Sequence, residues 1–210
     1  MQEIEFKFQV PVKKRKALQK AFTLLKAEPI HLAAQYFDTA DQTLVKHCIA
    51  IRRRQENDEW KQTFKAVNSA KVLSRLELEF DIAPPETTTL DLDNYKAYPA
   101  AYKKLKRALG LPQTTLELLF ETNIQRLRVL QDVGSSTVEI ALDIGKIFEE
   151  QNSVDIFEIE FELKQGSIED LIAFIRPWVQ KYQLTLDTHS KSDYGLLAVR
   201  QQSSFSAQYQ

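Results

Sequence analysis

The sequence predicts an α+β protein in which about eight antiparallel strands close into a β-barrel, with helices packed on the outside. Three observations predict this fold. Many segments alternate apolar and polar residues, other segments carry apolar residues at helical spacing, and the polar positions of the strands are strongly ionic. We expect one domain over residues 1–200 and a frayed tail over residues 201–210.

The strand patterns follow one another from the start of the chain. In the first, Ile4, Phe6 and Phe8 share one face and charged residues the other, because successive side chains of a strand point to opposite faces. A period of two residues is the main sequence signal for a half-buried strand. The expected strands are residues 2–8, 31–39, 47–55, 59–66, 74–80, 120–130, 137–145 and 156–164.

The helical patterns are fewer, and their ends carry recognisable signals. Pro99 starts one helix and Gly110 ends it, while Ser167 is a suitable N-cap for another. Pro177 is expected to kink that helix or divide it in two. The expected helices are residues 12–27, 99–110 and 167–182, with a short one at about 191–200.

Composition and charge limit the classes of function. The 210 residues include 28 basic and 29 acidic ones, and the formal net charge of −1 argues against a purely electrostatic binder of nucleic acid or membrane. The single cysteine, Cys48, forms no internal disulfide and indicates a reducing compartment. No secretory signal and no apolar run of about 20 residues is visible. We therefore expect a cytoplasmic protein without a nucleic-acid or membrane partner.

The ionic faces of the strands carry the functional hypothesis. Acids at Glu158 and Glu160 alternate with apolar residues on one strand, and bases at Arg52 and Arg54 lie on the face opposite Ile49 and Ile51 on another. On an open sheet such faces would be solvated. In a barrel whose apolar side lies under helices they would line a wet bore, which needs ions or a ligand because buried charges require partners. Carboxylates suit Mg²⁺ or Mn²⁺, and arginine and lysine suit phosphate. The pattern favours a polyvalent phosphate held partly through metal ions.

A series of motifs resembles the CYTH superfamily, the triphosphate tunnel metalloenzymes. It begins with Glu3-x-Glu5-x-Lys7 and covers nearly residues 1–200. The later motifs are YFDT (36–39), AIRRR (50–54), TFKA (63–66), RLE (75–77), LFETNIQR (119–126), EIALDIG (139–145), EIEFELKQG (158–166) and HSKSDYG (189–195). Their spacing looks most like the bacterial inorganic triphosphatases, which often carry a second, helical CHAD domain that we do not expect here.

The resemblance implies an eight-stranded antiparallel tunnel, a small triphosphate substrate, and Mg²⁺ or Mn²⁺ as cofactor. It implies hydrolysis of inorganic triphosphate to pyrophosphate and phosphate. The metal ligands carried over are Glu3, Glu5, Glu77, Asp143, Glu158 and Glu160. The catalytic and substrate-binding cations carried over are Lys7, Arg52, Arg54, Lys65, Arg126 and Lys191, with Arg75 as a further substrate-binding residue.

The alternatives are other chemistries on the same fold and a binding protein. A thiamine or nucleoside triphosphatase, a class IV adenylyl cyclase, and a non-catalytic polyphosphate-binding module all fit the same ionic faces. The full set of acids favours an enzyme, because binding of an anion alone would be better served without them. The sequence leaves the oligomeric state and the choice between the two metals open.

Overall fold

The computed structural model describes residues 4–67, 75–85, 90, 92–110, 115–149, 152–189, 191 and 193–195. Residues 201–210, for which a frayed tail was predicted, lie outside this part, as does most of the short helix predicted at 191–200. The strands are β1 (Glu5–Gln9), β2 (Glu28–Asp38), β3 (Ile49–Glu56), β4 (Glu59–Val67), β5 (Arg75–Ile82), β6 (Glu117–Val133), β7 (Ser136–Glu149), β8 (Asn152–Gln165) and β9 (Thr185–Leu186).

The strands form one sheet with the order β5-β4-β3-β2-β6-β7-β8-β1-β9. The pairs β1/β8, β1/β9, β3/β4 and β4/β5 are antiparallel. Each of the eight predicted segments overlaps one of the strands β1 to β8, which confirms the α+β class with an antiparallel sheet. Within the described residues β5 and β9 end the sheet, so closure into a barrel is not detected there. The two-residue strand β9 was not predicted, because alternation cannot be recognised over so short a segment.

The helices are α1 (Val12–Leu24), α2 (Thr43–Lys46), the 3₁₀ helix η1 (Asp93–Ala97), α3 (Pro99–Leu109) and α4 (Ile168–Tyr182). Ser167 caps α4 by accepting a hydrogen bond from the Asp170 amide, as its sequence predicts. The helix continues through Pro177 and is not divided there. In the described part of the chain no helix is long and apolar enough to cross a membrane.

The chain divides into two compact units. Unit 1 comprises residues 1–32, 123–147 and 154–191, and unit 2 comprises residues 33–122, 148–153 and 192–210. Each unit has its own hydrophobic core. Strands β2 and β6 each have residues in both units.

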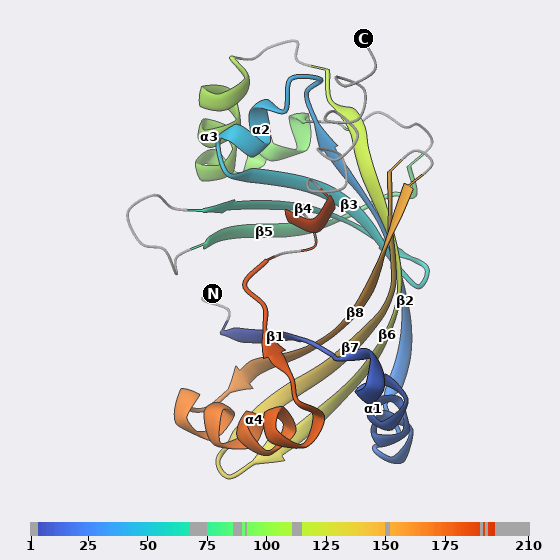
Figure 1. Ribbon diagram of the computed structural model, residues 1–210. Coiled ribbons are helices and arrows are strands. Elements are labelled where there is room, and N and C mark those ends of the chain that lie inside the picture. The colour runs from blue at the N-terminus through green and yellow to red at the C-terminus, as the bar shows by residue number, and fades with distance from the viewer. Residues whose placement is uncertain are drawn as a thin grey trace. The chain divides into compact units, whose positions relative to one another are not determined.

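The core of unit 1 lies on one face of strands β1, β7 and β8, where it is covered by α1 and α4 (Figure 1). Phe22 of α1, Leu171 of α4 and Phe161 of β8 are fully buried in it. In the β1/β8 register, Phe8 lies opposite Ile159 and Lys7 lies opposite Glu160. Since neighbouring residues of a strand point to opposite faces, the charged residues of these strands lie on the face away from the helices.

The core of unit 2 has the same design. Ile51 of β3 lies opposite Phe64 of β4, and both are fully buried in one core with Tyr95 and Leu105 of the helical segment. The next residue of β3, Arg52, lies opposite Thr63 on the other face. In both units the apolar side of the sheet therefore lies under helices, as the alternation predicted.

A buried carboxylate fixes the segment that leads from β2 into α2. Asp38 is 2% exposed. Its Oδ1 accepts hydrogen bonds from the amides of Thr39 (2.7 Å) and Leu44 (2.8 Å), and its Oδ2 accepts one from the amide of Val45 (3.0 Å). The side chain thus satisfies two of the first backbone donors of α2, which a four-residue helix cannot satisfy internally.

Replacement of this carboxylate is expected to destabilise unit 2. The change Asp38→Ala leaves three backbone amides without their partner, and the free energy of unfolding should fall by roughly 2–4 kcal/mol. Urea unfolding followed by circular dichroism measures the change. Asp41→Ala is the control, because Asp41 lies exposed in the same turn and accepts hydrogen bonds from the hydroxyls of Thr39 and Thr43 and not from buried amides. Equal stability of Asp38→Ala and the control would contradict this role.

Candidate active site

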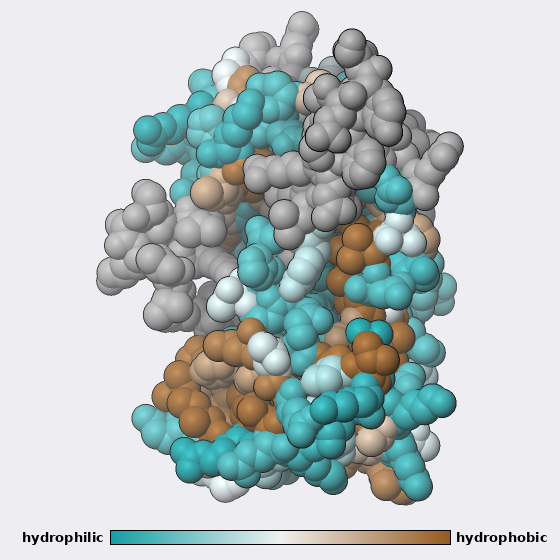
Figure 2. Space-filling view, viewed as in Figure 1, coloured by the Kyte–Doolittle hydropathy of each residue, from teal (hydrophilic) through white to brown (hydrophobic). Residues whose placement is uncertain are grey.

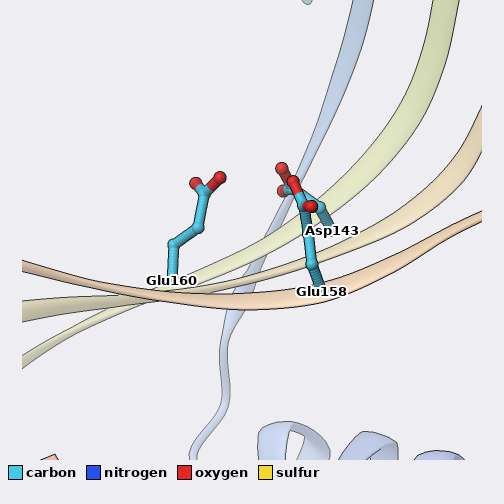
Figure 3. Close-up of side chains that lie close together, drawn as sticks. All are labelled: Asp143, Glu158 and Glu160. Carbon is cyan, nitrogen blue, oxygen red and sulfur yellow. The ribbon is translucent and has the colours of Figure 1, made fainter. Parts of the chain in front are cut away.

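Unit 1 carries a compact group of opposite charges on the face of the sheet away from α1 and α4. We call Lys7, Arg126, Asp143, Glu158, Glu160 and Lys191 the acid–base cluster. Its carboxylates come from β7 and β8, and one oxygen from each of the three lies within 4.8 Å of the others. Figure 3 shows the three carboxylates on the same side of the strands. Asp143 and Glu158 are fully buried, and Glu160 is 8% exposed.

The alternation of β8 places its two acids together. Glu158 and Glu160 are two residues apart, so both side chains leave the strand on the face opposite Ile159 and Phe161. Those apolar residues hold the strand against the core of unit 1. The packing of one face therefore determines where the carboxylates of the other face point.

Two cations bind the carboxylates of the cluster closely. Arg126 makes a bidentate pair with Asp143, with Nε–Oδ1 and Nη2–Oδ2 distances of 2.7 Å, and it also contacts Glu160. The Lys191 ammonium lies 2.7 Å from Asp143 Oδ2 and 2.9 Å from Glu160 Oε1, and it contacts Glu158 as well. Charge-assisted pairs of this kind are the strong ones among protein hydrogen bonds.

Lys7 approaches the cluster from β1. Its ammonium lies 3.6 Å from Glu158 Oε2 and 3.8 Å from Asp187 Oδ2. The β1/β8 register brings it there, because Lys7 pairs with Glu160 on the charged face of both strands. The pKa of Arg126 is raised well above its ordinary value, because the charges of Glu160 and Asp143 outweigh its burial, and the charge of Glu5 on β1 adds to them.

The electrostatics of the cluster divide its acids into two kinds. Burial alone would raise the pKa of Asp143 and Glu160, but the charges of Lys191 and Arg126 outweigh it, and both pKa values are lowered. For Glu158 burial prevails over the attraction of Lys191, and its pKa is raised. The pKa of Lys191 is raised well above its ordinary value, because the three carboxylates outweigh its burial. Glu158 is thus the acid of the three for which the neighbouring cations do not outweigh burial.

The geometry of Glu158 also fits a bound cation. Neither of its buried carboxylate oxygens accepts a well-formed hydrogen bond within the described residues, and their contacts are ionic, to Lys191 and Lys7. Three carboxylates with oxygens this close form an all-oxygen donor set, which is the set that hard divalent cations such as Mg²⁺ prefer. The cluster therefore offers the donors that a hard divalent cation requires.

Unit 2 carries a second charged group, rich in bases, on the polar face of β3, β4 and β5. Glu79 lies at its centre: Oε2 is 3.3 Å from Arg54 Nη2 and 3.9 Å from Arg52 Nη2, and Oε1 is 3.9 Å from Lys61. Arg52 also donates a hydrogen bond to the Tyr36 hydroxyl at 3.4 Å. We call Arg52, Arg54, Lys61 and Lys65 the basic group. It offers cationic side chains of the kind that bind phosphate oxygens.

The structure brings the predicted site residues together in two sets. Six of them form the acid–base cluster of unit 1, with Glu5 nearby. Lys65 and Glu77 form an ion pair of 2.8 Å in unit 2, next to Arg52 and Arg54 on the same face. Arg75 lies in β5, but its side chain, like the whole of Glu3, is outside the described part. The prediction that both sets line one bore stays a prediction.

Sequence analysis missed two acids that contact these sets. Glu79 alternates with apolar residues like its neighbours on β5, so the pattern showed its face but not its partners. Asp187 is 8% exposed and contacts Lys7 and Gln9. It follows a strand of two residues, where no alternation is visible, and its only sequence signal is its position four residues before Lys191.

Fold and site together define the class of protein. It is an α+β protein whose antiparallel sheet carries helices on its apolar face and buried, paired charges on the other. The chain belongs to the CYTH family, since the model of the CYTH domain matches residues 1–193.

Three known proteins show what the chain is similar to. It is 31% identical over 201 residues to an inorganic triphosphatase of Haemophilus influenzae. This match covers 94% of this chain and 55% of that protein. The chain thus spans about half the length of this curated relative. Among solved structures, the chain is similar to an adenylyl cyclase candidate from Hippeastrum that is reported to have a dominant triphosphatase activity. The TM-score is 0.65 at 18% identity, and the match covers 93% of this chain and 96% of the other.

An adenylate cyclase candidate from Bacillus halodurans matches with a TM-score of 0.62 at 20% identity, over 90% of this chain and 94% of that one. At these levels of identity the two structures support the fold and say nothing about the reaction.

Proposed function

We propose that the chain hydrolyses inorganic triphosphate to pyrophosphate and phosphate in the presence of Mg²⁺ or Mn²⁺. The observation that carries this proposal is the acid–base cluster, in which three buried carboxylates and three cations converge. Membership of the CYTH family and the similarity to the Haemophilus influenzae inorganic triphosphatase support the choice of reaction.

The carboxylates of the cluster would hold the metal. Asp143, Glu158 and Glu160 supply the donors described above, and Glu3, Glu5 and Glu77 are the further acids proposed for this role. When bound, a divalent ion polarises phosphate oxygens and makes a coordinated water more acidic. Because the oxygens of Glu158 make only ionic contacts, we expect a bound cation to stabilise its ionised carboxylate more than those of the other two acids.

The cations of the chain would bind the substrate and stabilise the leaving group. Lys7, Arg126 and Lys191 in unit 1 would neutralise phosphate oxygens beside the carboxylates. Those proposed in unit 2 are Arg52, Arg54, Lys65 and Arg75. Water attacks the terminal phosphorus, the phosphoanhydride bond breaks, and the electron pair leaves on pyrophosphate. Phosphoryl transfer depends mainly on positioning and electrostatic stabilisation, so the site needs no protein nucleophile.

A substrate panel tests this function. Purified protein is incubated with inorganic triphosphate, thiamine triphosphate or ATP, each with Mg²⁺, Mn²⁺ or EDTA, and phosphate and cyclic AMP are measured. We expect phosphate release to be fastest from inorganic triphosphate and absent with EDTA. Faster hydrolysis of thiamine triphosphate or ATP would show that the substrate differs from the one proposed. Formation of cyclic AMP would show that the reaction is a cyclisation. Tight binding of triphosphate by calorimetry without turnover in either metal would identify a binding protein.

A further inference from the structure

We propose that Asp187 is a positioning residue of the acid–base cluster: it holds Lys7 and shapes the turn that brings Lys191 to the three carboxylates. Its effect on catalysis rests on the function proposed above, whereas its effect on the two lysines rests on geometry alone. Asp187 is not one of the three grouped acids, and sequence analysis assigned it no role.

The side chain of Asp187 contacts strand β1. Its Oδ2 accepts a 2.7 Å hydrogen bond from Gln9 Nε2 and lies 3.8 Å from the Lys7 ammonium. The carboxylate is 8% exposed, so these contacts are shielded from solvent. Lys7 is thereby held between two acids, Asp187 on one side and Glu158 on the other.

Asp187 also binds the turn that follows β9. Asp187 Oδ1 accepts hydrogen bonds from the backbone amide of His189 at 2.9 Å and lies 3.2 Å from His189 Nδ1. This is the arrangement in which an aspartate stabilises a turn two residues ahead. The backbone amide of Asp187 donates to the Lys7 carbonyl at 2.8 Å, and the Lys7 ammonium donates to the His189 carbonyl. One residue therefore ties the turn to β1 through both backbone and side chain.

Lys191 follows this turn in the chain. It comes two residues after this turn, and its ammonium contacts all three carboxylates of the cluster. A change in the direction of the turn would move Lys191 away from them. The oxygens of Asp187 are themselves taken up by Gln9, Lys7 and His189, which makes it a support for cluster residues and not a donor to metal or substrate. Residues that orient site groups in this way typically contribute 10–100-fold to activity or metal affinity.

Two variants separate the charge of Asp187 from its turn. Asp187→Asn keeps an oxygen for the His189 amide and loses the charge beside Lys7, whereas Asp187→Ala loses both. With inorganic triphosphate and Mg²⁺, kcat should fall about 10-fold in the first and about 100-fold in the second. Asp155→Asn is the matched control, because Asp155 also pairs with a lysine, Lys146 at 3.1 Å, but is exposed at the surface of the same unit. Its kcat should stay unchanged.

A second measurement does not depend on turnover. Acylation with acetic anhydride, followed by peptide mass spectrometry, gives the labelling rate of each lysine. Lys7 and Lys191 should be protected in the wild type and in Asp155→Asn, and labelled several-fold faster in Asp187→Ala. Lys103, on α3 of unit 2, is the internal reference.

The outcomes are distinct. Unchanged labelling and unchanged kcat in Asp187→Ala would overturn the proposal. If the wild type hydrolyses no triphosphate, the proposed function fails, and the labelling rates still decide whether Asp187 places the two lysines. If Asp187→Ala does not fold, Asp187→Asn decides, and a Tm loss in that variant without faster labelling in its folded state would make Asp187 a stabilising residue only.

Discussion

Glu158→Gln is expected to lower kcat for triphosphate hydrolysis about 10²–10³-fold while leaving the Tm at neutral pH unchanged or higher. Glutamine has nearly the same shape but one neutral oxygen in place of a charge, so it cannot supply the carboxylate that a divalent cation needs. The loss of activity should be accompanied by weaker binding of Mn²⁺, which electron paramagnetic resonance measures without substrate.

The expected gain in stability follows from the raised pKa of Glu158. A carboxyl group whose pKa is higher in the folded than in the unfolded protein costs free energy when it is ionised, and the cost is present at every pH above the folded value. Burial is the main cause of this shift, ahead of the attraction of Lys191. The amide removes the cost, so a variant that is inactive but fully stable would identify Glu158 as functional.

Glu162→Gln is the control for Glu158→Gln. Glu162 lies on the same face of β8, four residues further along, and pairs with Lys164 at 2.9 Å outside the acid–base cluster. Its replacement should change kcat less than about threefold, since exposed pairs contribute little. Wild-type kcat and wild-type Mn²⁺ affinity in Glu158→Gln would contradict the metal site.

Arg126→Ala is expected to lower the free energy of unfolding by about 3–5 kcal/mol, because it removes one of the two cations that bind the buried carboxylates of Asp143 and Glu160. Arg128→Ala is the matched control. Arg128 lies two residues along on the same face of β6 and pairs with Glu28 at 3.1 Å, where Glu28 is largely exposed. That pair should contribute no more than about 1 kcal/mol to the free energy of unfolding. Urea unfolding at neutral pH compares the three proteins.

The pH dependence of stability gives a second test of Arg126. The charges of Lys191 and Arg126 keep the pKa values of Asp143 and Glu160 below the ordinary values of 3.8 and 4.5 for these side chains. A lowered folded pKa adds stability that is fully present above the unfolded value and disappears as the pH falls through the folded one. Wild-type stability should therefore decline below about pH 4.5, and Arg126→Ala should show a shallower decline. Parallel curves for the two proteins would show that the pair does not control these titrations.

The sequence was most informative where one face of a strand is buried. Ile159 and Phe161 are typical of a strand with an apolar face, and that pattern alone placed Glu158 and Glu160 on the other face. The same logic grouped Arg52 with Arg54. These predictions succeed because alternation is a consequence of backbone geometry, which every strand shares.

The parts that could not be predicted depend on contacts between distant residues or on very short elements. Strand β9 has two residues and α2 has four, too few for a period to be visible. The role of Asp187 depends on Gln9, which lies 178 residues earlier in the chain. Pairing across such a separation follows from the order of strands in the sheet, and the alternation pattern contains no information about that order.

The position of β1 between β8 and β9 has a consequence for the time course of folding. The hydrogen bond from Lys7 to the His189 carbonyl joins residues 182 positions apart. Closing so long a loop costs entropy before any contact compensates for it, and proteins rich in such contacts fold slowly. Hairpins such as β3/β4 should therefore gain amide-exchange protection early during refolding, and the amides of β1 should gain it last. The acid–base cluster would then be among the last parts of the molecule to form during folding.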